Sequence, residues 1–137
     1  TLIGRIGWDE LTGGAGSDRI FGGSGNDILD GGADNDRLRT GSGDDIVTGG
    51  AGDDTIVLVR GSDTLIFAEG DGRDRVRSFD DADLIALDIE GIDSFQDLLD
   101  SADQRGSRTV LDFGDGDQLR LLDTNLSDPS EAQFVFV

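Results

Sequence analysis

Residues 13–57 read GGAGSDRIF GGSGNDILD GGADNDRLR TGSGDDIVT GGAGDDTIV, five nonapeptides in one unbroken phase. The same period extends over residues 4–66, with GRIGWDELT before these repeats and LVRGSDTLI after them. Self-similarity at a short fixed period is typical of a solenoid, in which each repeat is one unit that stacks on its neighbours. The first half of the chain is therefore predicted to be a repeat structure.

Particular columns of the repeat carry the same residue type throughout. The sixth residue is always aspartate: Asp9, Asp18, Asp27, Asp36, Asp45, Asp54 and Asp63. The eighth is always aliphatic: Leu11, Ile20, Leu29, Leu38, Val47, Ile56 and Leu65. An eighth turn, EGDGRD at 69–74, follows a two-residue insertion and ends at Asp74. The aliphatic residue predicts a very short strand with one inward side chain, and stacking turns this column into a continuous apolar ladder.

Glycines at the first, second and fourth positions favour a turn with positive φ angles, whose carbonyls converge closely on a bound ion. Asp34 replaces the fourth-column glycine, and aspartate tolerates the left-handed region better than most residues. The aspartate that closes each turn adds a carboxylate oxygen, and calcium binds six to eight such oxygens from carboxylates and carbonyls. Magnesium fits less well because it prefers strict octahedral geometry. The turns are therefore predicted to bind calcium.

Other interpretations of these glycine- and aspartate-rich turns fit less well. A single such turn would be a flexible solvated loop, but seven copies in phase with an aliphatic column indicate an ordered structure. A phosphate-binding loop would need a following GK[ST], and an EF-hand would need a glutamate at position twelve of its loop; neither pattern occurs.

The composition excludes several classes of function. The 137 residues include 30 acidic and 11 basic side chains, all arginine, for a formal charge of −19, so no basic surface for nucleic acid is expected. Because the chain has no histidine and no cysteine, His-assisted nucleophiles, thiol chemistry, disulfides and imidazole metal sites are excluded. No stretch is apolar enough to insert stably into a membrane. The chain also lacks methionine, and we expect it to be a piece of a longer protein.

The nine-residue period ends near Val76, and a second module is predicted for 76–137. A strand is expected along 84–89, a helix that begins at Ser94 with Phe95, Leu98, Leu99 and Ala102 on one face, and a hairpin of 109–113 and 118–122. The closing residues 134–137 are expected to be an edge strand. We interpret Asp80, Asp81 and Asp83 as a solvated acidic face.

The repeats resemble the repeats-in-toxin (RTX) nonapeptide GGxGxDxUx, where U is a large aliphatic residue. The resemblance implies an all-β fold, a right-handed parallel β-roll with two nonapeptides per coil over residues 1–75, followed by a small β-rich capping module with one or two short helices over 76–137. It also implies calcium between turns 18 residues apart, with Asp9, Asp27, Asp45 and Asp63 on one edge and Asp18, Asp36, Asp54 and Asp74 on the other. Three gaps on each edge allow up to about six ions.

The residues assigned to metal binding are the aspartates of the sixth column and the second- and fourth-column residues of the turns. The set comprises Asp9, Gly14, Gly16, Asp18, Gly23, Gly25, Asp27, Gly32, Asp34, Asp36, Gly41, Gly43, Asp45, Gly50, Gly52, Asp54, Gly61, Asp63, Gly70, Gly72 and Asp74.

The second half is similar to the region that follows the β-roll in serralysin-type metalloproteases and related RTX exoproteins, through RDRVRSFDDADLIALD, TVLDFGDGDQLRLL and AQFVFV. The resemblance implies a type I secretion signal in this module, an ABC exporter and an upstream domain as partners, a monomer, and secretion to the extracellular space. The leading interpretation is a non-catalytic calcium-binding module that folds outside the cell and supports folding of the upstream domain.

Two other functions remain open from the sequence. The first is an adhesion or polysaccharide-contacting module attached to a lyase, epimerase or adhesin, which would use a regular ladder of exposed side chains. The outward column is irregular, however: it reads Glu10, Arg19, Ile28, Arg37, Ile46, Thr55 and Thr64. The second is an enzyme with an acidic catalytic pair, and nothing in the sequence separates such a pair from the calcium ligands.

Overall fold

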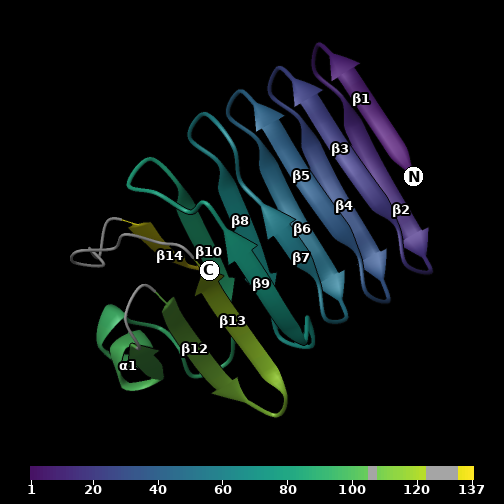
Figure 1. Cartoon of the computed structure of the whole chain (residues 1–137). Helices are drawn as coiled ribbons and strands as arrows, with labels where there is room; N and C mark the ends of the chain where they lie inside the picture. Colours follow the sequence, from purple (N-terminus) through teal and green to yellow (C-terminus); the bar gives the residue numbers. More distant parts are fainter. Residues whose placement is uncertain (105–107, 123–132) are drawn as a thin grey trace.

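The chain winds its repeats into a stack of short parallel strands that form two facing sheets (Figure 1). The computed structural model describes residues 1–104, 108–122 and 133–137. The strands of the repeat half are β1 (Leu2–Ile6), β2 (Glu10–Ala15), β3 (Arg19–Ser24), β4 (Ile28–Ala33), β5 (Arg37–Ser42), β6 (Ile46–Ala51), β7 (Thr55–Val57), β8 (Thr64–Ala68) and β9 (Arg73–Arg77).

Successive repeats alternate between the two sheets. Sheet A contains β1, β3, β5, β7 and β9 in this spatial order, and sheet B contains β2, β4, β6 and β8. Ile20 pairs with Leu38 in sheet A, and Leu29 pairs with Val47 in sheet B, so equivalent residues lie 18 positions apart. Two nonapeptides therefore make one coil, as predicted, and the chain completes about five coils.

The aliphatic column forms the core between the sheets. Its members from the second repeat onward are almost completely buried: Ile20, Leu29, Leu38, Val47, Ile56, Leu65 and Val76. In the first coil Leu2 and Leu11 are only partly buried, because no coil covers them. A three-residue strand buries little apolar surface alone, so the stability of the roll depends on stacking.

The first position of the repeat changes from glycine to large apolar residues towards the end of the stack. The first position of the early repeats is glycine, but Leu58 and Phe67 occupy this position later, and both are fully buried. Phe67 pairs in register with Leu87 of the next coil in sheet B and packs against Phe113, with ring centroids 5.6 Å apart. The glycine-lined edges of the first coils thus give way to an apolar core in the last ones.

The second half continues both sheets. Its elements are β10 (Leu84–Asp88), α1 (Phe95–Asp100), β11 (Ala102–Gln104), β12 (Arg108–Gly114), β13 (Asp117–Leu122) and β14 (Phe134–Phe136). Strand β10 extends sheet B after β8, and β13 extends sheet A after β9. The hairpin β12–β13 and the edge strand β14, which pairs with β10, are as predicted.

The helix begins after Ser94 as expected, with the amide of Asp97 donating to the Ser94 hydroxyl at 3.3 Å. The prediction for Ala102 is wrong, because this residue lies in β11 and pairs with Leu111. The predicted all-β class and parallel β-roll are confirmed, and α1 is the one short helix of the described residues. With six residues, this helix is too short to cross a membrane.

Candidate metal centres

The turns at both edges of the roll adopt the backbone conformation that the glycine pattern predicts. The second- and fourth-position glycines have positive φ throughout, for example 101° at Gly32 and 127° at Gly43. Asp34 also has a φ of 75°, and its carboxylate accepts a hydrogen bond of 3.0 Å from the amide of Gly16. Substitution of glycine by aspartate is therefore tolerated at this turn, as expected.

The sixth-column aspartates form a hydrogen-bonded ladder along each edge. The amide of Asp27 donates to Oδ1 of Asp45 at 2.7 Å, and the amide of Asp36 donates to Oδ1 of Asp54 at 2.7 Å. The same contact spans the two-residue insertion, because the amide of Asp54 donates to Oδ1 of Asp74 at 2.9 Å. Each carboxylate therefore uses one oxygen to join its coil to the coil before it.

The second oxygen of these carboxylates is buried and has no protein partner. This is true of Oδ2 in Asp9, Asp27, Asp36, Asp45, Asp54 and Asp74. A buried carboxylate oxygen without a donor is costly, since ionised groups in protein interiors are normally paired, hydrogen-bonded or bound to a metal. The regular recurrence of the same unpartnered atom in the described turns indicates a cation-binding role.

At the first-position glycines, oxygen atoms of two coils approach so closely that a side chain would collide with them. A Cβ at Gly22 would lie 2.7 Å from Oδ2 of Asp27 and 2.4 Å from the carbonyl oxygen of Thr40 in the next coil. A Cβ at Gly49 would lie 2.5 Å from Oδ2 of Asp54 and 2.9 Å from Oδ2 of Asp74. Carboxylate and carbonyl oxygens from two successive coils thus converge at one place, which is the mixed oxygen donor set that calcium prefers.

Burial opposes ionisation of the aspartates in the absence of a cation. Desolvation, with a contribution from neighbouring carboxylates, raises the pKa of Asp45 and of Asp54 to about 6 from 3.8. The pKa of Asp74 rises to about 8 for the same reasons. The pKa values of Asp27, Asp36 and Asp63 are also raised, again mainly by burial. Ionisation of these carboxylates in the folded roll is therefore unfavourable unless a bound cation neutralises their charge.

One junction between coils is built differently. Thr40 takes the place of a first-position glycine and is fully buried. Its hydroxyl donates to Oδ2 of Asp63 at 3.1 Å and accepts from the amide of Val59 at 3.1 Å. Opposite Thr40 the regular pairing ends, since β7 stops at Val57. This junction thus contains a hydroxyl group where the other junctions have a glycine.

The sequence analysis missed Asp83, which extends the ladder. This aspartate is 5% exposed, so its assignment to a solvated face is wrong. Its Oδ1 accepts from the amide of Asp63 at 3.0 Å, and its Oδ2 accepts from the amide of Asp80 at 2.9 Å. The segment Asp83-Leu84-Ile85 repeats the aspartate–x–aliphatic spacing of the repeats, and this signal could have identified it.

Other acidic residues form part of the turns without coming together as an acidic metal cluster. Asp117 accepts from the amides of Gly70 and Gly72, both at 2.9 Å, and so fixes the turn before β9. Nowhere in the described ranges do three acidic side chains converge on one point. The candidate sites therefore consist of one or two carboxylates supplemented by backbone carbonyls.

The comparisons with known proteins agree with this geometry. Residues 3–38 and 30–65 match the family model of the RTX calcium-binding nonapeptide repeat, which spans four copies of the repeat. No curated protein matches the chain significantly by sequence.

Solved structures extend the likeness beyond the repeats. Extracellular lipase LipA from Serratia marcescens is 27% identical with a TM-score of 0.60; the match covers 96% of this chain and 20% of the lipase, so the chain spans about a fifth of that protein. The AlgE6R3 subunit of the Azotobacter vinelandii mannuronan C5-epimerase shares the fold, with 24% identity, a TM-score of 0.53, and 93% and 78% of the two chains covered. Residues 3–65 of this chain are RTX calcium-binding nonapeptide repeats.

Proposed function

We propose that the chain is a non-catalytic calcium-binding module of a secreted protein, which folds outside the cell after type I export and supports folding of an upstream domain. The observation that carries the proposal is the set of buried, unpartnered Oδ2 atoms in front of the first-position glycines. In this proposal the second- and fourth-column residues shape the turns, and the sixth-column aspartates, Asp9 to Asp74, supply the carboxylate ligands.

The geometry of the turns supports five bound ions, one fewer than the six that the sequence allows. Five first-position glycines, Gly4, Gly13, Gly22, Gly31 and Gly49, each face Oδ2 of the aspartate in their own repeat. The sixth junction contains Thr40, whose hydroxyl contacts Oδ2 of Asp63, so that only Oδ2 of Asp45 is left there without a protein partner. We therefore assign five calcium ions to the roll.

The charge of the chain explains why calcium would control folding. A formal charge of −19 favours an expanded chain, and stacking the coils brings aspartates of like charge into contact along both edges. Calcium, when bound, would supply positive charge at each junction and join two coils. Binding free energy then becomes folding free energy, because the unfolded chain has no preformed site.

Calcium concentration is far lower in bacterial cytosol than outside the cell, so the chain would remain unfolded until export is complete. Residues 76–137 would cap the roll and contain the export signal, whereas residues 1–75 would bind the ions. The similarity to an extracellular lipase supports this arrangement.

Export can be tested with a passenger domain fused before residue 1, in bacteria that carry a type I exporter. The intact chain should bring the passenger into the medium, and a fusion that lacks residues 76–137 should leave it in the cell. Calcium-free medium should still contain the passenger, but the module should then be sensitive to protease. Equal export with and without residues 76–137 would contradict the assignment of the signal.

A further inference from the structure

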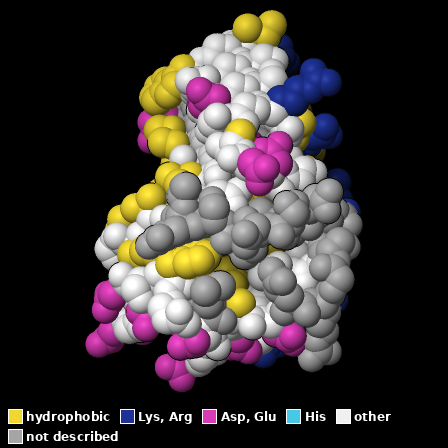
Figure 2. Space-filling model, turned by 90° about the vertical axis from the view of Figure 1, so that its left-hand side faces the viewer, with side chains coloured by type: hydrophobic (Ala, Val, Ile, Leu, Met, Phe, Trp, Pro, Cys, Tyr) yellow, Lys and Arg dark blue, Asp and Glu magenta, His cyan; other side chains and the backbone are white. Residues whose placement is uncertain are grey.

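Large hydrophobic side chains that stay exposed in the folded chain are concentrated in its first two coils. Ile3, Ile6 and Trp8 are 62%, 89% and 63% exposed, and Phe21, which pairs in register with Ile3, is 38% exposed. We call these four residues the apolar corner. Figure 2 shows hydrophobic side chains at the end of the molecule where Figure 1 places β1. A concentration of exposed apolar side chains commonly marks a surface that contacts a partner.

The outward orientation of the two turn residues follows from their place in the repeat. Ile6 pairs in register with Ser24, and Trp8 is equivalent to Asn26, 18 residues later. Ser24 and Asn26 are exposed although coils lie on both sides of them. These positions therefore point to solvent in a covered coil as well, and small polar residues suffice there for the roll to form.

Ile6 and Trp8 do not shield the core of the roll. In the first coil the core residues Leu2 and Leu11 are only partly buried. A side chain packed over them would lose most of its own exposure, whereas Ile6 keeps 89% and Trp8 keeps 63%. Apolar surface left in water costs about 25 cal/mol per Å², and a partner that covers it removes this cost. The two side chains thus contribute little to folding and remain available for binding.

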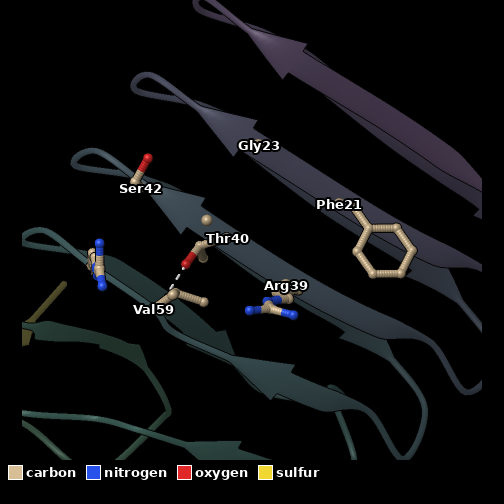
Figure 3. Close-up of a pocket in the computed structure, with 8 residues that line it drawn as sticks. Phe21, Gly23, Arg39, Thr40, Ser42 and Val59 are labelled. Atoms are coloured by element: carbon tan, nitrogen blue, oxygen red, sulfur yellow. Dashed lines mark hydrogen bonds between the residues drawn. The ribbon is translucent and has the colours of Figure 1, made fainter.

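Basic side chains lie beside the apolar corner. Every arginine in the described strands belongs to sheet A, and Arg39 pairs in register with Phe21. Figure 3, a view of the hollow that both residues line, shows them on neighbouring strands. In the described part of the chain no ion pair involves the four exposed arginines of the first coils, which are Arg5, Arg19, Arg37 and Arg39. Their guanidinium groups can bind phosphate oxygens through paired hydrogen bonds.

The first coils carry little of the negative charge of the chain. Residues 1–21 contain three acidic side chains and two arginines, whereas the whole chain contains 30 and 11. Neighbouring coils are about 4.8 Å apart, and charges beyond about 10 Å are largely screened at physiological salt. The acidic later coils therefore contribute little to the field at the apolar corner, which can approach a surface that carries phosphate groups.

We propose that the apolar corner attaches the folded module to a phospholipid bilayer, with Ile6 and Trp8 inserted at the level of the headgroups and the neighbouring arginines in contact with lipid phosphates. Tryptophan favours this interfacial region because its ring is apolar and its N–H can form a hydrogen bond. Attachment of this kind is peripheral and needs no membrane-spanning segment. The inference rests on the proposed function in one respect, because the corner exists only when the coils are stacked.

The shape of the corner favours a bilayer over a protein partner. Gly7, between Ile6 and Trp8, has a φ of 115°, and an isoleucine that is 89% exposed projects from the surface. A projecting apolar turn beside arginines suits a soft surface that has phosphates above hydrocarbon. A second copy of the chain is disfavoured as the partner, because the two chains would each carry a formal charge of −19.

The fluorescence of Trp8 tests the proposal directly, because it is the only tryptophan of the chain. The intact chain in calcium is titrated with vesicles of equimolar phosphatidylcholine and phosphatidylglycerol, and with vesicles of phosphatidylcholine alone. We expect a blue shift of the emission, protection from a water-soluble quencher and flotation of the chain with the vesicles, all stronger on the anionic ones. Unchanged emission and no flotation would overturn the proposal, as would a blue shift that rises with protein concentration in the absence of vesicles.

Variants locate the contact. I6S/W8N gives the first coil the residues that the second coil has at these positions, and flotation should show vesicle affinity about ten-fold or more lower. I46S/V135S removes two exposed apolar side chains from sheet B and is the matched control, for which the affinity should change less than about two-fold. An equal loss in this control would overturn the assignment to the corner. R5Q/R39Q should bind the anionic vesicles about three-fold or more weakly, and unchanged binding would contradict the phosphate contacts.

Circular dichroism of every variant separates this proposal from the calcium proposal. If I6S/W8N does not fold in calcium, Ile3→Ser tests the same corner through one exposed side chain of β1, and it should bind about three-fold or more weakly. A chain that folds with calcium but ignores the vesicles contradicts the bilayer proposal alone. A chain that is folded in chelator and still binds the vesicles through Trp8 contradicts the proposed function alone.

Discussion

The hydroxyl of Thr40 donates a 3.1 Å hydrogen bond to Oδ2 of Asp63, and both residues are almost completely buried. The equivalent oxygen of six other aspartates in the ladders has no protein partner. Thr40 thus provides a partner for one of the two carboxylates at this junction, whereas Oδ2 of Asp45 has none. Thr40 also lines a hollow of sheet A, at the place where the pairing of β5 with β7 has ended at Val57.

Replacing Thr40 by glycine should increase the number of bound calcium ions by one. The change removes the hydroxyl that contacts Asp63 and gives this junction the glycine that the other five junctions have. Calorimetric titration gives the number of ions, and Thr40→Ser, which keeps the hydroxyl, is the control. An unchanged stoichiometry in Thr40→Gly would contradict the prediction that the Thr40 side chain keeps an ion out of this junction.

Gly31→Ala should lose one calcium ion and weaken calcium-dependent folding. A Cβ at this position would lie 2.6 Å from Oδ2 of Asp36 and 2.3 Å from the carbonyl oxygen of Gly49, so the methyl group would fill the site. Ala33→Ser, at an exposed position of the same turn, is the control and should behave as the native chain. Native calcium stoichiometry in Gly31→Ala would place the ion elsewhere.

Without calcium, acidification should favour the folded roll. The folded pKa values of Asp45 and Asp54 are about 6 and that of Asp74 is about 8, whereas the unfolded values lie near 3.8. The folded state therefore binds more protons, so stability falls as the pH rises from about 4 through these folded values. Circular dichroism in chelator should show more strand at pH 5 than at pH 8. A strand signal that is lower at pH 5 would contradict the predicted sign.

Asp83→Asn should destabilise the last coils without changing the number of calcium ions. Asp83 accepts hydrogen bonds from the amides of Asp63 and Asp80, and an asparagine amide would leave one of these buried donors facing an NH2 group. The expected cost is about 1–3 kcal/mol in the free energy of unfolding, measured by denaturant titration in calcium. The exposed neighbour variant Asp81→Asn should have little effect, and equal effects of both variants would argue against the structural role.

The sequence predicted the roll well because a strict period of nine fixes both the turn and the strand of each repeat. The ligand ladder was predictable for the same reason, since Asp27 and Asp45 must be equivalent once the coil has 18 residues. Asp83 was missed because the segment before it, 75–82, contains none of the glycines of the other turns, although Asp83 follows Asp74 by nine residues and makes the same hydrogen bond to Asp63.

The clustering of arginines on sheet A is not evident when the repeat column is read from one repeat to the next. Arg19 and Ile28 are neighbours in that column, but the 18-residue coil places them on opposite sheets. The role of Thr40 was equally hidden, since its hydroxyl contacts Asp63 and Val59, which are distant in sequence and close only in the stacked coils.

The central claim is that calcium converts an expanded acidic chain into the stacked roll. Far-UV circular dichroism of the intact chain, titrated with calcium from chelator to about 10 mM and with magnesium in parallel, tests it most directly. The account predicts a cooperative gain of strand signal with calcium and little change with magnesium. The same folded spectrum in chelator and in millimolar calcium would contradict it.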